Sequence, residues 1–433
     1  MKPLSRKILS LALPAIAANI TTPLLGLVDM AIVGHLGSPV FIAAIALGGT
    51  MFSMLYWVFA FLRMGTGGMV AQAYGAFDRR EMSAVFFRGL TMALLAGIAL
   101  IALSGFLSRV LLAFVGNGDE AALVAERYFN LLIWGAPAYL STYVLNGWFA
   151  GCQAPKKALL TSLIINLTNI AASLVLVYGL GLGVTGVALG TLSAQVAGCL
   201  SGLIMARGTG LHRSPLRTVF SSGRLRKFFS LNFDIFLRTL CLVAVTVWFT
   251  RAGARQGDII LAANALLLQL FLLFSYMMDG FAYAAEALVG SAVGASDVRA
   301  ERSVISQIFR LALPLSLIFT VVYAIGAEVI VGLLSDDPHV AAAASDFRWW
   351  IVLVPLAGFP AFVWDGVFIG ATLSRRMLLA MAVAAAIFFG LYFLLFPVMG
   401  NHALWLAFVS YLACRGGVQW LLYRTSPAGS KRR

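Results

Sequence analysis

Long apolar stretches recur along this chain, and the polar residues gather between them. Each stretch reaches the roughly 20 helical residues that cross a ~30 Å hydrocarbon core. Lipid offers backbone amides no hydrogen-bond partner, so such stretches must form helices. The pattern predicts twelve spans, approximately over residues 8–34, 40–74, 85–107, 123–152, 157–180, 183–206, 228–252, 259–290, 303–334, 345–372, 377–399 and 403–423.

A shift of 219 residues lays the second half of the chain on the first. LNGWFAGCQAPKKALL (145–160) falls on WDGVFIGATLSRRMLL (364–379), and VAQAYGAFDRR (70–80) falls on VGSAVGASDVR (289–299). Six spans per half bring both halves into the membrane from the same side. We therefore expect an all-α polytopic membrane protein, with two six-helix bundles related by a pseudo-two-fold axis along the membrane normal.

The repeat and the polar segments divide the chain into four parts. The expected parts are an N-terminal lobe (1–206), a flexible cytoplasmic linker (207–227), a C-terminal lobe (228–424) and a basic tail (425–433). Most of the 31 basic residues fall in alternate loops, which predicts that both termini are cytoplasmic.

Composition excludes several other classes of protein. Of 433 residues, 61% are hydrophobic and 11% charged, and the mean hydropathy is +0.93, unlike any soluble domain. Topology accounts for the net charge of +14, so nucleic-acid binding is not expected. The four cysteines show no CxxC spacing, which argues against a disulfide framework or a metal site.

One carboxylate, Asp29, lies near the far end of the first span. A charge there costs several kcal/mol unless it faces protein or water, so intramembrane acids are candidates for function. At helical pitch Asn19, Thr22 and Gly26 share its quadrant of the helix. Two interpretations stay open: an ion or proton site, or a buried aspartate that only joins two helices.

Two further polar stripes could meet Asp29 in the first bundle. The fifth span carries one and the sixth carries the other. Such a pocket would be hydrogen-bonded and partly hydrated, and would let the carboxylate take up protons near physiological pH. Packing of helices by small polar side chains is the alternative. The two stripes consist of Ser162, Asn166, Asn169 and Ser173, and of Thr191 and Gln195.

The second bundle is richer in charge. Asp234 and Arg238 lie one turn apart, where they could neutralise each other. These acids line a cation or substrate path in one interpretation, and form a structural network around Arg238 in the other. The further candidates here are Asn264, Asp279, Tyr283 and Glu286 in the eighth span and Asp365 in the tenth.

No phosphate-binding loop accompanies the glycines, so transport would have to run on an ion gradient. A membrane-embedded enzyme would need clustered nucleophiles, bases or metal ligands, which the sequence does not show. No enzymatic activity and no cofactor are expected. A channel remains the alternative that saturable exchange would exclude.

Several motifs resemble the DinF branch of the multidrug and toxic compound extrusion (MATE) transporters. They are LALPxIxxNITxPLLGLVDxAxVGHLGSPV at the start, LNxDIFLRTL from Leu231, MDGFAYAAEALVG from Met278, WDGVFIGAT from Trp364 and GNHALWLA from Gly400. The resemblance covers nearly the whole chain. It implies a twelve-helix, two-lobed exporter that exchanges protons or sodium for lipophilic, usually cationic, small molecules.

By the same resemblance, Asp29 matches the cation-coupling carboxylate, and Pro14 the proline at which the first helix bends. Asn169 and Thr191 match polar partners of that site, whereas Ser173 replaces a second aspartate of the common NxxxD pattern. We therefore expect H⁺ rather than Na⁺ as the coupling ion. Asp365 resembles a cation-binding aspartate of another branch.

We expect a monomer that contacts membrane lipid and exports small molecules. A sodium-coupled exporter and a flippase for lipid-linked precursors are the alternatives. The flippase would need a wide basic cavity for pyrophosphate, whereas the deep charges here are mainly acidic.

Overall fold

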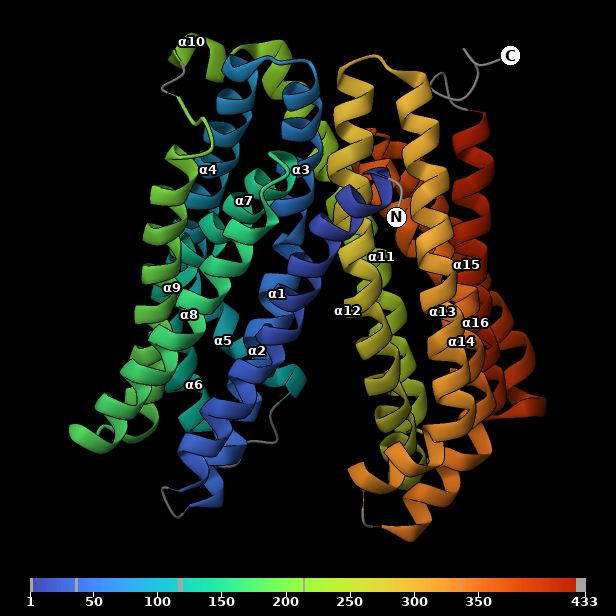
Figure 1. The fold of residues 1–433 in the computed structure, drawn as a ribbon. Coiled ribbons are helices and arrows are strands. Elements are labelled where there is room, and N and C mark those ends of the chain that lie inside the picture. The colour runs from blue at the N-terminus through green and yellow to red at the C-terminus, as the bar shows by residue number, and fades with distance from the viewer. Residues whose placement is uncertain (1–2, 36–37, 116–119, 213–214, 336, 426–433) are drawn as a thin grey trace. The chain divides into compact units, whose positions relative to one another are not determined.

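The computed structural model describes residues 3–35, 38–115, 120–212, 215–335 and 337–425, and every regular element in these ranges is a helix (Figure 1). The elements of the first half are α1 (Pro3–Gly34), α2 (Pro39–Trp57), η1 (Val58–Ala60), α3 (Phe61–Gly75), α4 (Arg79–Ala102), α5 (Ser104–Val115), α6 (Glu120–Leu132), η2 (Ile133–Gly135), α7 (Ala136–Gly151), α8 (Pro155–Leu174), η3 (Val175–Gly179) and α9 (Gly183–Arg207). Those of the second half are α10 (Leu216–Val219), α11 (Ser222–Ala254), α12 (Asp258–Gly294), α13 (Val298–Leu334), α14 (Pro338–Gly370), α15 (Ser374–Met399) and α16 (Asn401–Arg424).

Each of the twelve predicted spans corresponds to one helix or to two helices joined by a tight turn. Within the described residues, nine segments are long and apolar enough to cross a membrane. The other three predicted spans are α1, α6 with α7, and α16. Three spans contain breaks that the sequence pattern did not predict: the 3₁₀ turns η1 and η2, and the turn at Leu103 between α4 and α5. The all-helical membrane fold is thus confirmed.

Contacts within the chain define two compact units. Residues 13–232 form the N-terminal unit, and residues 1–12 together with 233–433 form the C-terminal unit. Helix α1 passes from one unit to the other between Ala12 and Leu13, two residues before Pro14.

The core of the N-terminal unit lies along α7, which packs against α3, α4 and α9. Its Trp148 and Phe149 are fully buried. Gly147 and Gly151 allow the close approach of α3, because a methyl group at Gly151 would lie 2.8 Å from the carbonyl oxygen of Gly67.

The C-terminal unit is built in the same way around α14, which packs against α12, α13 and α16. Its most apolar stretch is 72% buried, against 22% for that of α13. A methyl group at Gly370 would lie 2.6 Å from the carbonyl oxygen of Glu286. Gly370 and Glu286 each lie 219 residues beyond Gly151 and Gly67, so the sequence repeat is also a packing repeat.

The loops repeat as well. Phe77 and Ser296, 219 residues apart, have φ of 57° and 56°, and Gln153 and Thr372 have φ of 56° and 51°. These backbone conformations are uncommon for residues with side chains. The residue after the first pair is an aspartate in each half, which caps the next helix through backbone N–H groups.

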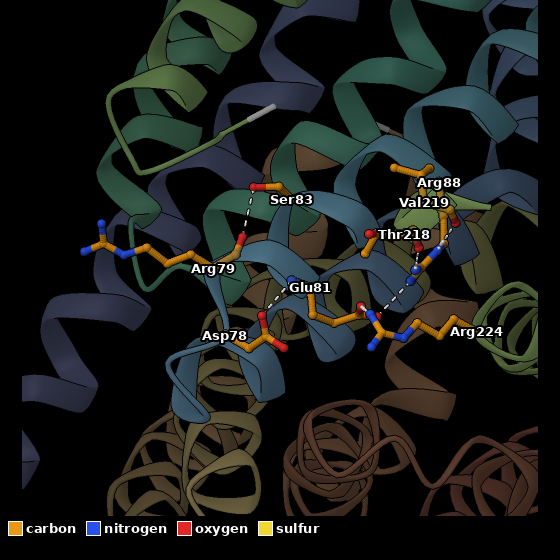
Figure 2. Close-up of polar contacts among 8 residues, drawn as sticks. All are labelled: Asp78, Arg79, Glu81, Ser83, Arg88, Thr218, Val219 and Arg224. Carbon is orange, nitrogen blue, oxygen red and sulfur yellow. Dashed lines mark hydrogen bonds and ion pairs between the residues drawn. The ribbon is translucent and has the colours of Figure 1, made fainter. Parts of the chain in front are cut away.

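Several residues of the segment 207–227, which was expected to be a flexible linker, contact α4 of the N-terminal unit (Figure 2). The buried Arg88 of α4 donates to the carbonyl oxygens of Val219 (2.6 Å) and Thr218 (2.8 Å), at the end of α10. Glu81 accepts from Arg88 at 2.8 Å and from Arg224 at 2.5 Å. Five hydrogen-bond donors on a planar guanidinium suit it to this bridging position. These contacts attach α10 and the start of α11 to α4.

Candidate functional site

Asp29 lies near the end of α1 with 6% of its surface exposed, inside the N-terminal unit. The side chains of Asn169 on α8 and Thr191 on α9 are the polar groups that lie beside its carboxylate. Nδ2 of Asn169 also donates to Oγ1 of Thr191 at 2.8 Å. Three helices therefore meet at this carboxylate.

Three buried oxygen atoms around this point accept no hydrogen bond. They are Oδ1 of Asp29, Oδ1 of Asn169 and Oγ of Ser173. Asn169 and Ser173 lie one turn apart on α8, and both are fully buried. Leaving such an atom without a partner costs about 1–3 kcal/mol, more when the group is charged. A set of hard oxygen ligands of this kind suits a proton, a hydrated cation or Na⁺.

Gly190 brings α9 close to this part of α8. A methyl group there would lie 2.8 Å from the backbone nitrogen of Ser173 and would overlap its hydroxyl. The glycine therefore sets the separation of the two helices beside the carboxylate.

Tyr128 of α6 belongs to the same cluster, although the sequence pattern did not single it out. It is 4% exposed, and it lies near Thr191 and close enough to Asp29 to interact with the carboxylate charge. Its ring packs against Gly48 of α2. The signal available in the sequence was a tyrosine within a predicted span, since the hydroxyl of a buried tyrosine usually finds a polar partner.

Two hydrogen bonds hold the second half of α1 against α8 and η3. Nδ2 of Asn166 donates to the carbonyl oxygen of Thr21 at 3.2 Å, and the Tyr178 hydroxyl donates to that of Ile32 at 2.8 Å. Asn166 thus contacts the α1 backbone rather than the Asp29 cluster. Gln195 is buried against Gly135 of η2. The side chain of Thr22 lies outside the described residues.

In the C-terminal unit Asp365 of α14 is held by three donors. Arg238 and Arg415 donate to Oδ2, the latter at 2.8 Å, and Gln419 donates to Oδ1 at 2.6 Å. The expected pairing of Arg238 with Asp234 is therefore wrong: Asp234 accepts instead from the Ser374 hydroxyl at 2.7 Å. One carboxylate is thus shared by two guanidiniums.

The other predicted polar residues of this unit lie on α12. Asp279 is close enough to Arg415 to interact with its charge, and Glu286 is fully buried one turn beyond Tyr283. Asn264 exchanges two hydrogen bonds of 2.9 Å with Asn401 and accepts from Trp405 at 2.8 Å, so its amide holds α12 to α16.

Among the described residues, no group of three or more His, Cys, Asp or Glu side chains is placed to hold a metal ion. The unpartnered oxygens of Asn169 and Ser173 on α8, together with Oδ1 of Asp29, add one carboxylate and two neutral groups to the buried polar atoms of this unit.

Comparison with known proteins gives strong matches along the whole chain. The family model described as MatE matches residues 14–175 and 232–394. The chain is 41% identical to DNA damage-inducible protein F of Escherichia coli K12, over 94% of this chain and 89% of that protein. It is 26% identical to a probable multidrug resistance protein NorM of Bradyrhizobium diazoefficiens, over 92% of this chain and 89% of the relative.

Solved structures share the fold. A crystal structure of MATE in the bent conformation superposes with a TM-score of 0.87 at 20% sequence identity, covering 97% of this chain and 95% of the other. A transporter of the MOP superfamily from Pyrococcus furiosus, described as having a binding pocket of reverse polarity, gives a TM-score of 0.84 at 21% identity.

Proposed function

Because this chain belongs to the MatE family of transporters, integral membrane proteins that move small molecules, we propose that it is a proton-coupled exporter of lipophilic cations. In this proposal it works in the bacterial inner membrane, with both termini in the cytoplasm. The observation that supports it most is the Asp29 cluster, in which a buried carboxylate keeps one oxygen without a donor.

The two buried aspartates differ in what surrounds them. Asp365 accepts from two guanidiniums and an amide, so its negative charge is already balanced. Asp29 has only neutral partners, Asn169 and Thr191. A carboxylate without a counter-ion in a buried place gains more from binding a proton or a cation. We therefore assign the coupling step to Asp29.

Proton coupling is favoured over sodium coupling by the residue at position 173. A Na⁺ ion is held best by several oxygens that include enough negative charge to replace its hydration. Ser173 brings a neutral hydroxyl to the cluster, which leaves Asp29 as its single carboxylate. A proton needs only that one group.

Exchange requires that the proton and the substrate favour different conformations of the same protein. In the proposed cycle the neutral form of Asp29 favours release of the substrate, and the anionic form restores affinity. In this cycle the second half of α1 changes conformation when Asp29 gains or loses its proton. Asn166 and Tyr178 connect the backbone of this half to α8 and η3. Pro14, two residues beyond the boundary between the units, is the proposed hinge.

Transport by the purified protein in liposomes identifies the coupling ion. Liposomes that carry either a pH gradient or a Na⁺ gradient, with choline as the matched salt, are loaded with the lipophilic cation tetraphenylphosphonium. We expect the pH gradient to drive its movement and the Na⁺ gradient to have no effect. Movement driven by Na⁺ alone would support the sodium-coupled alternative, and equal movement without any gradient would contradict antiport.

A further inference from the structure

A cavity of about 710 Å³ lies in the C-terminal unit, between α13, α14 and α16. Its lining joins three arginines to aromatic side chains, and none of the described residues that line it is acidic. The residues that matter for its chemistry are Arg302, Arg310 and Arg424, with Trp364, Trp420 and Tyr423.

The three arginines converge from two helices. Arg302 and Arg310 lie eight residues apart on α13, with Ser306 between them on the same face. Arg424 ends α16, and its guanidinium stacks on the Trp420 ring at 4.8 Å. All three arginines are exposed.

Glu301, the residue before Arg302, is 3% exposed, accepts from the Tyr423 hydroxyl and does not line the cavity. The arginines therefore give the cavity a positive charge that a ligand with negative charge would complement.

The apolar surface next to the cavity begins at Arg310. On α13 the next charged residue after Arg310 is Glu328, so the intervening helix is long enough to cross most of a ~30 Å hydrocarbon core. Leu313, which lines the cavity, is 42% exposed, and Leu317 and Val321 on the same face are 46% and 55% exposed. The arginines therefore lie at one end of an exposed apolar stripe. This arrangement matches a phospholipid, which has a charged headgroup at one end of its apolar acyl chains.

We propose that this cavity binds the phosphate headgroup of an anionic phospholipid, with an acyl chain along Leu313, Leu317 and Val321. Guanidinium groups match the geometry of phosphate oxygens and bind them through paired N–H donors. Tryptophan and tyrosine favour the level of the headgroups. In the orientation proposed above, Arg302 and Arg424 lie at the cytoplasmic ends of their helices, so the lipid would come from the inner leaflet.

The test measures lipid binding to the full chain in detergent, by native mass spectrometry during titration with phosphatidylglycerol or with phosphatidylcholine. We expect phosphatidylglycerol to bind about tenfold more tightly or better. The triple variant Arg302→Gln, Arg310→Gln, Arg424→Gln should lose that preference. If the triple variant does not fold, Arg310→Gln and Arg424→Gln are tested singly, and each should weaken binding several-fold.

A matched control removes the same charge elsewhere. Arg80, Arg299 and Arg375 are exposed arginines outside the lining, and the triple change of these to Gln should keep the preference. An unchanged preference in the lining variant, or an equal loss in the control, would overturn the proposal. Competition by glycerol 3-phosphate at the same concentration as the lipid would also overturn it, because it would identify a site for soluble anions. These results do not depend on the coupling ion or on transport.

Discussion

Asn169 and Thr191 are joined by a hydrogen bond of 2.8 Å from the amide nitrogen to the hydroxyl oxygen, directly beside the Asp29 carboxylate. This bond fixes the amide so that its nitrogen serves as donor and its oxygen is left without a partner. The pair connects α8 to α9 and gives the carboxylate neutral neighbours only.

Removal of this amide tests its role. Asn169→Ala removes the donor to Thr191 and the amide beside the Asp29 carboxylate, and a neutral hydrogen bond of this kind contributes about 0.5–1.5 kcal/mol. We expect substrate exchange in liposomes to fall about tenfold or more. Thr161→Ala is the matched control, because Thr161 is a buried polar residue of the same helix and its hydroxyl donates to the Lys157 carbonyl, away from α1. Equal losses in the two variants would contradict a specific role for Asn169.

Position 173 decides the coupling ion in this account. Ser173→Asp adds a second carboxylate beside Asn169, and should allow a Na⁺ gradient to drive exchange in liposomes. Ser173→Ala should keep proton-driven exchange within a few-fold, because it removes no charge. If a Na⁺ gradient does not drive exchange by a folded Ser173→Asp variant, the charge at this position does not determine the coupling ion.

The contact between α8 and α9 should be sensitive to size. Gly190→Ala forces a methyl group against the Ser173 backbone, and overpacking of this kind costs about 1–3 kcal/mol. We expect a lower midpoint of thermal unfolding in detergent. Gly49→Ala, with no atom within 4 Å of the added methyl group, should leave the midpoint unchanged. If Gly190→Ala leaves the midpoint of thermal unfolding unchanged, α8 and α9 can move apart without a loss of stability.

Asp365 should matter for stability more than for coupling. Asp365→Asn leaves Arg238 and Arg415 buried without their counter-ion, and breaking a buried pair costs about 3–5 kcal/mol. The yield of folded protein should fall sharply, while the folded fraction keeps proton-driven exchange. The control Asp346→Asn changes an exposed acid and should behave as wild type. Normal stability with lost proton coupling would move the coupling site to the C-terminal unit.

The membrane fold could be predicted because it follows from composition over long windows. Apolar stretches in lipid have few alternatives to helices, and the 219-residue repeat reappears as matched glycine contacts and matched loop backbones, such as those of Phe77 and Ser296. The breaks at η1 and η2 were not predicted, since 3₁₀ turns here interrupt sequences that remain apolar.

The site was predictable only in part. Helical spacing placed Asn169 and Ser173 on one face, but it does not say which helix a side chain meets. Arg238 therefore found its partner on α14 rather than one turn away on α11. Tyr128 was missed for the same reason, because its place beside Thr191 depends on how α6 packs on α9.

Proton release is the most direct test of Asp29. The purified protein is mixed with tetraphenylphosphonium in weakly buffered detergent solution, and a pH-sensitive dye reports the protons set free. The account predicts release from the wild type, and none from Asp29→Asn although that variant still folds. Equal release from both proteins would contradict the assignment of the coupling proton to Asp29.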